Sequence, residues 1–240
     1  PIRSLHNYIK SVLIHEVCSS VEFKDSLSVV DLSCGRGGDN GKYLSSDNKL
    51  EFYLGLDLSS NVNEAASRYY YDTHFREKYK EKPKALFLQY DTSKSILNKE
   101  GCLSKDCDTY LDILLGSDKT YTKEMKSIHK KYNGLLKSRF NVVSSQFTLH
   151  YYFKDEETLR GYLQNLSDMC QKDGYFIGTC YDGMKLFQIF KDLDSEHISM
   201  DDDSGVKVYD IEKKYDIESF DFDKDDMTNM LGNKIDVYMS

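Results

Sequence analysis

The chain has 240 residues, of which 40% are hydrophobic and 30% are charged, and this composition excludes fibrous and broadly disordered proteins. The length suffices for one α/β domain with its own core. A formal net charge of −8 and a pI of about 5.3 argue against non-specific binding along a nucleic-acid duplex, because that mode needs a basic surface. Apolar runs fall short of the roughly 20 residues that span a bilayer, and the first residues resemble no signal or transit peptide, so we expect a protein that is not secreted.

An amphipathic helix that packs beside a sheet is predicted for residues 5–21, because apolar residues recur there near helical spacing. Its apolar positions are Leu5, Ile9, Val12, Leu13 and Val17. Short apolar runs then predict buried parallel strands at 27–31, 50–57 and 85–91, separated by helices at 38–45 and from 59 to about 80.

A fourth strand is predicted at 140–147, after an interval longer than compact α/β connections need. We therefore interpret about 99–139 as an insertion. The second half of this segment is the only basic stretch of an acidic chain, with Lys119, Lys123, Lys126, His129, Lys130, Lys131, Lys137 and Arg139. A solvated helical face and a surface for RNA phosphates or a partner both explain it.

The remaining pattern predicts a helix at 155–172, a strand at 175–180 and a short apolar helix at 183–193. An acidic, β-rich part follows at about 194–240, with strands at 206–211 and 235–239 and an exposed acidic loop at 220–226. We expect a single domain over 1–240 with an α/β fold, in which helices cover both faces of a mostly parallel sheet. Such sheets bind ligands at the carboxyl ends of their strands.

The six cysteines are scattered over predicted helices, strands and a loop, and no C-x-x-C pair would hold a metal ion. They are Cys18, Cys34, Cys102, Cys107, Cys170 and Cys180. We therefore expect reduced thiols and no metal site.

A glycine-rich turn follows the first predicted strand. Residues 29–39 read V-V-D-L-S-C-G-R-G-G-D. Gly35, Gly37 and Gly38 allow a tight turn and a close approach of the backbone to a ligand. The spacing fits neither the dinucleotide motif G-x-G-x-x-G nor the phosphate-binding loop G-x-x-x-x-G-K-[ST].

Acidic residues end the next two strands. Asp57 lies about twenty residues after the glycine turn, where a carboxylate can accept hydrogen bonds from both hydroxyls of a ribose. Asp91 and Thr92 end the third strand, from which they can reach an adenine. Each carboxylate alone is more often a helix N-cap, but three successive strand ends together predict a nucleoside ligand. S-adenosylmethionine is the nucleoside that needs no phosphate cradle.

Four motifs carry a specific resemblance. They are R-x-x-x-N-[aromatic]-x-K-S at 3–11, D-L-x-C-G-[KR]-G-G-D at 31–39, S-S-Q-F-x-x-H-Y at 144–151 and G-Y-F-I-G-T at 174–179. In this order they resemble the eukaryotic and large-DNA-virus mRNA cap guanine-N7 methyltransferases. The resemblance implies a Rossmann-like class I methyltransferase that uses S-adenosylmethionine to methylate N7 of the 5′ GpppN cap during mRNA capping.

The resemblance also implies roles for individual residues. Those near the cofactor are Lys10, Asp31, Ser33, Gly35, Asp57, Leu58, Asp91, Thr92 and Gln146. Those at the cap or its phosphates are Asn7, Arg36, Arg68, Phe147, His150 and Tyr151. Phe147, His150 and Tyr151 are the expected catalytic residues, which position the guanine. We expect no general base, because N7 already presents a lone pair.

Two alternatives stay open: another S-adenosylmethionine-dependent methyltransferase, and a catalytically inactive methyltransferase-fold subunit of a capping complex. The chain stops before the family's last segments, so we expect C-terminal strands to be missing and the chain to be a fragment of a larger capping polypeptide. Expected partners are 5′-capped RNA and either upstream triphosphatase and guanylyltransferase domains or a stimulatory subunit, with no membrane. We expect a cytoplasmic location for a viral protein and a nuclear one for a cellular protein.

Overall fold

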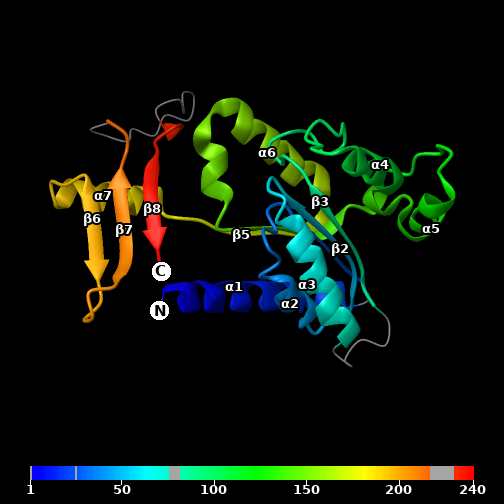
Figure 1. The fold of residues 1–240 in the computed structure, drawn as a ribbon, viewed down its shortest axis with the longest axis horizontal. Coiled ribbons are helices and arrows are strands. Elements are labelled where there is room, and N and C mark those ends of the chain that lie inside the picture. The colour runs from blue at the N-terminus through cyan, green and yellow to red at the C-terminus, as the bar shows by residue number, and fades with distance from the viewer. Residues whose placement is uncertain (1, 25, 76–81, 217–229) are drawn as a thin grey trace.

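The computed structural model describes residues 2–24, 26–75, 82–216 and 230–240. Its larger sheet has five parallel strands in the order β3-β2-β1-β4-β5 (Figure 1). These strands are β1 (Leu27–Asp31), β2 (Leu50–Asp57), β3 (Lys84–Gln89), β4 (Phe140–Gln146) and β5 (Cys170–Thr179). The first two have the predicted bounds, whereas β3 and β4 end slightly earlier than predicted and β5 begins earlier. The strand order reverses between β1 and β4, the position at which open α/β sheets bind ligands.

Helices cover both faces of this sheet, as the α/β pattern predicts. One face carries α1 (Ile2–Cys18), α2 (Asn40–Leu44) and α3 (Val62–Phe75). The other carries α4 (Lys105–Leu114), α5 (Lys123–Tyr132) and α6 (Glu156–Met169). Short 3-10 helices are η1 (Val21–Phe23), η2 (Leu135–Ser138) and η3 (Leu149–Lys154). The sheet is therefore the middle layer of a Rossmann-like domain.

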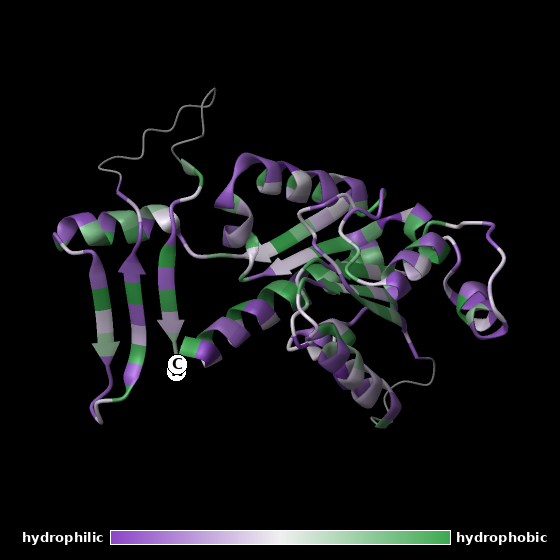
Figure 2. Cartoon of the chain, turned by 45° about the horizontal axis from the view of Figure 1, so that its top comes forward, coloured by the Kyte–Doolittle hydropathy of each residue, from purple (hydrophilic) through white to green (hydrophobic). Residues whose placement is uncertain are grey.

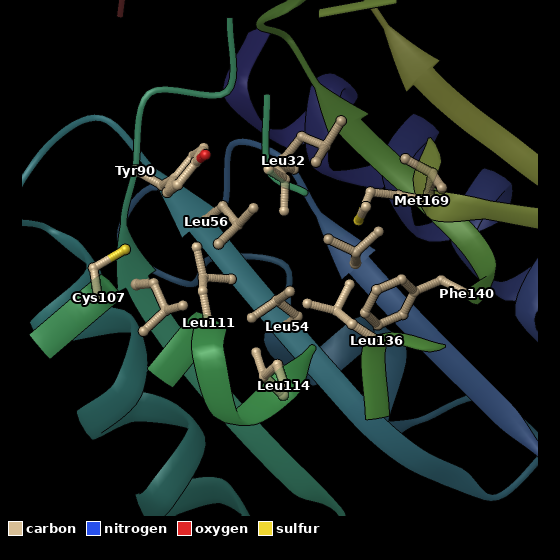
Figure 3. Close-up of a cluster of buried hydrophobic side chains, with 14 of the residues drawn as sticks. Leu32, Leu54, Leu56, Tyr90, Cys107, Leu111, Leu114, Leu136, Phe140 and Met169 are labelled. Carbon is tan, nitrogen blue, oxygen red and sulfur yellow. The ribbon is translucent and has the colours of Figure 1, made fainter. Parts of the chain in front are cut away.

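Successive residues of the buried strands pack into two separate cores, one on each face of the sheet, because side chains alternate across a sheet. In β1, Val29 packs with the α1–α3 layer and Val30 with the α4–α6 layer. Figure 3 shows the second core, where Leu54 and Leu56 of β2 face Leu111 of α4. Figure 2 shows the hydrophobic residues gathered in these central strands. Burial on both faces explains why these strands read as continuous apolar runs.

The segment predicted as an insertion, 99–139, contributes α4, α5 and η2 to the second core. Leu111 and Leu114 of α4, Tyr132 of α5 and Leu136 of η2 are buried there. The Tyr132 hydroxyl donates a hydrogen bond to the carbonyl of Ala85 at 3.0 Å, which fastens α5 to the start of β3. The segment is thus part of the layer that covers the sheet, and its description as an insertion stays a prediction.

Helix α1 was expected to pack its apolar positions beside the sheet, and for three of these positions this is wrong. Leu5, Ile9 and Val12 are exposed, while Ile14 and Cys18 are buried. The reason is positional, since the N-terminal half of α1 extends beyond the sheet toward β8 (Figure 1). Only the C-terminal half reaches the core between the sheet and α2.

The C-terminal part forms a second, antiparallel sheet of β6 (His197–Asp201), β7 (Lys207–Lys213) and β8 (Ile235–Met239), preceded by α7 (Gly183–Asp192). This confirms the predicted strands near 206–211 and 235–239. The predicted acidic loop at 220–226 lies outside the described residues. No helix in the described part of the chain has the length and apolar character needed to cross a membrane.

Candidate functional site

The glycine turn after β1 lies at the carboxyl edge of the larger sheet. Gly35 and Gly37 have φ values of +51° and +73°, in the left-handed region that favours glycine. A Cβ atom on Gly37 would lie 2.5 Å from Nδ2 of Asn40 and 2.8 Å from Cα of Ala65, so the turn packs against α3 without room for a side chain. A Cβ atom on Gly35 would meet nothing within 4 Å. The backbone at Gly35 therefore borders open space.

Asp57, at the end of β2, is tied to this turn. Its Oδ2 accepts a hydrogen bond from the backbone N–H of Gly35 at 2.8 Å. Its Oδ1 accepts hydrogen bonds from the backbone N–H and the hydroxyl of Ser59 at 2.9 and 2.8 Å. A carboxylate oxygen has two lone pairs, so Oδ2 keeps one for a ligand hydroxyl while Asp57 also orders the turn.

Asp31, at the end of β1, is a buried carboxyl group with 2% of its surface exposed. Its Oδ1 accepts a hydrogen bond from the N–H of Ser33 at 3.1 Å. Burial raises the pKa of Asp31 to about 7, and the nearby charges of Asp39 and Asp57 act in the same direction. The site therefore holds a concentration of negative charge that a cation would relieve.

Lys10 contacts a neighbour of this group. Its Nζ lies 2.9 Å from Oδ1 of Asp39, which also accepts from Nζ of Lys42 at 2.6 Å. Lys10 thus joins α1 to the residue that precedes α2, and its contact in this structure is with Asp39. Its predicted contact with the cofactor stays a prediction.

Asp91 and Thr92 follow β3 with their side chains engaged. Oδ1 of Asp91 accepts from the N–H and hydroxyl of Ser93 at 3.0 and 2.7 Å. The Thr92 hydroxyl donates to the carbonyl of Leu32 at 3.1 Å, which joins the end of β3 to the turn after β1. The exposed side chain of Leu58 follows β2 at the same edge. We call Asp31, Asp57 and Asp91 the strand-end carboxylates.

Asn165 of α6 holds the backbone of the segment that follows Asp91. This fully buried side chain donates from Nδ2 to the carbonyls of Thr92 and Lys94, both at 2.8 Å. Its Oδ1 accepts from the N–H of Ile96 at 2.9 Å. The three bonds satisfy a segment whose irregular backbone would otherwise be buried without partners.

Ser33 belongs to a triangle of hydroxyl groups between the glycine turn and the end of β4. Its Oγ lies 2.5 Å from Oγ1 of Thr148 and 3.3 Å from Oγ of Ser145. Thr148 and Ser145 are themselves 2.7 Å apart. Ser33 therefore connects the predicted cofactor side to the segment that carries His150.

Gln146 is the last residue of β4, and its buried side chain is fully engaged. Its Nε2 donates to Oγ of Ser144 at 3.1 Å, and its Oε1 accepts from the hydroxyl of Thr179 at 3.1 Å. Gln146 therefore ties the ends of β4 and β5 together.

Phe147 ends the strand with an unusual backbone. Its φ is 58°, which is costly for a bulky residue and persists only where the surroundings hold it. Its N–H donates to the carbonyl of Thr179 at 2.8 Å and lies 3.0 Å from the hydroxyl of the same residue. The strand stops here, and His150 and Tyr151 lie in η3.

Five aromatic side chains gather beside this turn, and we call them the aromatic cluster: His6, Phe147, His150, Tyr151 and Tyr181. The rings of His6 and Phe147 are centred 4.3 Å apart. His150 lies 4.8 Å from Tyr181 and 4.4 Å from Tyr151. Tyr151 is strongly exposed, whereas His150 is half-buried. The cluster offers flat apolar surfaces at the carboxyl edge of the sheet.

His150 has one unused polar atom. Its Nδ1 is buried and has no hydrogen-bond partner among the described residues. Burial also lowers the pKa of its imidazole, which favours the neutral ring. A buried polar atom without a partner is costly, so His150 is suited to a hydrogen bond with a ligand.

Arg36 and Arg68 share one acidic partner. Nε of Arg36 lies 3.6 Å from Oε2 of Glu64, and Nη2 of Arg68 lies 2.5 Å from Oε1 of Glu64. Arg68 also lines a groove of about 600 Å³ between α2 and α3, which runs from Gly37 to Asp72. Both guanidinium groups are exposed, and their predicted contact with the cap phosphates stays a prediction. Asn7 is exposed on α1, and its carbonyl accepts from the hydroxyl of Ser11 at 2.8 Å.

Several residues of this site escaped the sequence prediction. They are His6, Thr148, Asn165 and Tyr181. His6 directly precedes Asn7 in a predicted motif, and Thr148 lies inside another, so the motifs themselves were a usable signal. Asn165 reads as an ordinary polar residue of a helix, and only its burial shows its contacts. In the described part of the chain, no group of three or more His, Cys, Asp and Glu side chains could hold a metal ion.

The chain matches the family model of the mRNA (guanine-N(7))-methyltransferase domain over residues 1–237. A probable mRNA-capping enzyme of Acanthamoeba polyphaga mimivirus is 28% identical over 245 residues, which cover 100% of this chain and 18% of that protein. An mRNA cap guanine-N(7) methyltransferase of Aspergillus niger is 30% identical over 186 residues, which cover 75% of this chain and 29% of that protein. The chain spans less than a third of the length of either relative.

Among solved structures, an S-adenosylmethionine-dependent methyltransferase from Clostridium acetobutylicum resembles the chain with a TM-score of 0.49 and 18% sequence identity. The superposition covers 88% of this chain and 63% of that one.

Proposed function

The chain belongs to the mRNA (guanine-N(7))-methyltransferase family, and on that premise we propose that it transfers the methyl group of S-adenosylmethionine to N7 of the guanine in the 5′ cap of RNA. The observation that carries the proposal is the position of the aromatic cluster. It lies directly after β4, joined through Ser33 and Thr148 to the turn that Asp57 orders. A surface for a flat base therefore adjoins a site for a nucleoside.

The residues at the strand ends fit the cofactor. Asp31 is a buried carboxyl group whose pKa is raised to about 7 by burial and by neighbouring carboxylates, so a ligand with cationic groups would favour its ionised form. The open space at Gly35 leaves the backbone accessible. Oδ2 of Asp57 would accept from a ribose hydroxyl, and Asp91 and Thr92 would lie toward the adenine. When bound, S-adenosylmethionine supplies an electrophilic methyl group on a sulfonium sulfur.

The protein's contribution to the reaction would be positioning. Guanine N7 already has a lone pair in the plane of the ring, so no residue needs to remove a proton from it. Phe147 and Tyr151 would supply apolar and stacking surface for the base, and the neutral ring of His150 would give it a hydrogen bond. Placing the reacting atoms about 3–3.5 Å apart and in line provides a large share of the acceleration in such reactions.

The phosphate bridge of the cap would meet Arg36 and Arg68. Both guanidinium groups now face Glu64. Exposed ion pairs of this kind contribute little to stability, so phosphate oxygens can replace the carboxylate at small cost. Arginine suits this role because its planar group binds phosphate in a bidentate manner.

The decisive experiment is methyl transfer from isotopically labelled S-adenosylmethionine to a short capped RNA, followed by nuclease digestion and chromatography of the cap. We expect label in 7-methylguanosine released from the cap, and none with the same RNA bearing an uncapped 5′-triphosphate. Label on a ribose or on an internal base would contradict the proposed acceptor. Cofactor binding with no transfer to the cap would instead favour an inactive subunit of a capping complex.

The partners and location follow from the same proposal. Capped RNA is the acceptor, and the mimivirus relative, a probable mRNA-capping enzyme, extends well beyond the matched region. We propose that this chain works beside triphosphatase and guanylyltransferase modules, or with a stimulatory subunit. A viral protein would then act in the cytoplasm and a cellular one in the nucleus.

A further inference from the structure

Helix α3 ends in an unusual group of exposed aromatic side chains. Tyr70, Tyr71 and Phe75 are 56%, 60% and 67% exposed. The rings of Tyr71 and Phe75 are centred 5.1 Å apart, and Tyr70 stacks on His74 at 3.8 Å. Single exposed apolar residues are normal on protein surfaces. Here, however, three large exposed aromatic residues lie within six positions, with no exposed aliphatic residue among them. Their rings offer flat faces on which a planar ligand can stack.

Two of these rings lie in line with the proposed phosphate contacts. Glu64, Arg68, Tyr71 and Phe75 are spaced so that they share one stripe of the helix. The opposite stripe is buried and includes Val62, Ala65 and Tyr69, which fixes the first stripe toward solvent. The exposed stripe rises about 16 Å along the helix axis, from the Arg36 contact of Glu64 to the end of α3.

The groove between α2 and α3 connects the two parts. It holds about 600 Å³, and its lining includes Gly37 and Gly38 of the glycine turn together with Arg68, Tyr71 and Asp72 of α3. A chain that leaves the glycine turn along this groove passes Arg68 and then reaches Tyr71. Figure 1 shows α2 and α3 side by side at this place.

The charge of the groove indicates how a nucleic acid would bind there. Arg68 is balanced by Glu64, and Asp72 adds a further carboxylate, so the groove is not basic. A duplex or a long phosphate backbone would find little attraction. Single strands, in contrast, bind through bases stacked on aromatic side chains, and each stacked base adds to the affinity.

We propose that Tyr71 and Phe75, flanked by Tyr70, form a stacking platform for the first transcribed nucleotides of the capped RNA. The inference rests on the proposed function, which gives the order of the RNA along the protein. The guanine would lie at the aromatic cluster, the phosphate bridge at Arg36 and Arg68, and the following bases along α3. Arg68 marks the junction between phosphates and bases. Because of this platform, the protein would bind a capped RNA more tightly than guanosine triphosphate, which has no bases to stack there.

The test measures binding, which needs no methyl transfer. Fluorescence anisotropy of a labelled, capped ten-nucleotide RNA gives its affinity, and competition gives that of guanosine triphosphate, which has no transcribed nucleotide. We expect Tyr71→Ala and Phe75→Ala each to weaken RNA binding about tenfold and to leave guanosine triphosphate unaffected. Tyr71→Phe should bind RNA as the parent does, because the ring is kept. Tyr238→Ala, an exposed tyrosine of β8, is the matched control.

Added salt separates stacking from attraction to phosphates, because counterion release governs only the latter. The tenfold loss in Tyr71→Ala should persist at high salt. Parental RNA affinity in both alanine variants would overturn the platform, as would an equal loss of affinity for guanosine triphosphate. If the variants instead abolish self-association in sedimentation velocity while RNA affinity is unchanged, the surface is a protein contact. A protein that binds RNA through these rings but transfers no methyl group would contradict the proposed function and not the platform.

Discussion

The strand-end carboxylates and the aromatic cluster adjoin each other but are assembled in different ways. Each carboxylate ends or directly follows its own strand, so a local apolar run places it. The aromatic cluster instead joins α1, the turn after β4, η3 and the segment that follows β5, from His6 to Tyr181. The first region depends on the sheet alone, whereas the second depends on tertiary packing. The two should therefore fail independently when mutated.

The largest effect is expected at Asp57. Asp57→Ala removes the acceptor proposed for the ribose and also the bonds that Gly35 and Ser59 donate to it. Hydrogen bonds to a charged group contribute about 1.5–3 kcal/mol each. Because the bond to the ligand and the bonds that order the turn are lost together, we expect affinity for S-adenosylhomocysteine to fall about a thousandfold. Isothermal calorimetry measures this, and thermal unfolding should show a loss of about 1–2 kcal/mol from the disturbed turn.

Asp57→Asn is the matched control, because its amide oxygen can still accept from the Gly35 N–H. We expect it to fold like the parent and to lose only part of the affinity. Parental cofactor affinity in Asp57→Ala would remove the nucleoside from this edge of the sheet.

The aromatic cluster is tested at His150. His150→Ala should leave S-adenosylhomocysteine affinity nearly intact, since no described contact joins His150 to a strand-end carboxylate. Methyl transfer to capped RNA should fall about a hundredfold, the scale expected when a substrate-positioning group is lost. Single-turnover transfer and calorimetry on the same preparation separate the two quantities.

A control at the exposed end of the cluster sharpens this result. Tyr151→Phe keeps the ring and should retain most of the transfer rate. If His150→Ala weakens cofactor binding as much as it slows transfer, the two regions are one structural unit and the comparison fails.

The sequence predicts the features of this molecule that depend on a local run of residues, and it misses those that depend on tertiary packing. The bounds of β1 and β2 were predictable because both strands are largely buried on both faces and read as mostly apolar runs. Which part of α1 packs against the sheet was not predictable. Helical spacing reveals an apolar stripe, but it does not show whether a sheet lies beneath that stripe. Leu5 and Ile9 therefore pointed to a core that the N-terminal half of the helix does not reach.

The site shows the same limit. Gly35 and Asp57 could be paired in advance because strand ends meet at one edge, but the hydrogen bond between them makes Asp57 structural as well. The contact of His6 with Phe147 spans most of the chain and has no local signature. The left-handed φ of Phe147 is equally invisible, because residue type alone argues against it.

An intermediate effect is expected at Gly37, where the chain offers a close control. Gly37→Ala forces a Cβ to within 2.5 Å of Asn40 and 2.8 Å of Ala65 at a φ of +73°, so something must shift. We expect the free energy of unfolding to fall by about 2–3 kcal/mol. Gly38→Ala meets nothing within 4 Å and should stay near the parent in denaturant titration. Equal stability of the two variants would show that the turn does not pack against α3.

The smallest predicted effect concerns the pH dependence at Asp31. Burial, with Asp39 and Asp57 acting in the same direction, raises its pKa from 3.8 to about 7. Between about pH 4 and about pH 7 the folded chain therefore binds more protons than the unfolded chain. Without ligand, this group lowers the free energy of unfolding as the pH rises through that range. A ligand with a cationic amino group reverses the preference, because it favours the ionised carboxylate.

Affinity for S-adenosylhomocysteine, which keeps that amino group, should therefore rise roughly tenfold from about pH 6 to about pH 8. Binding near pH 7 should also release a proton, which calorimetry detects as a dependence of the apparent enthalpy on the buffer. Asp31→Asn keeps the shape of the side chain and removes its titration, so the ligand's own ionisation is the same in both proteins and cancels in the comparison. If Asp31→Asn shows the parental pH dependence and proton release, then the buried carboxyl group is not the partner of the cofactor's amino group.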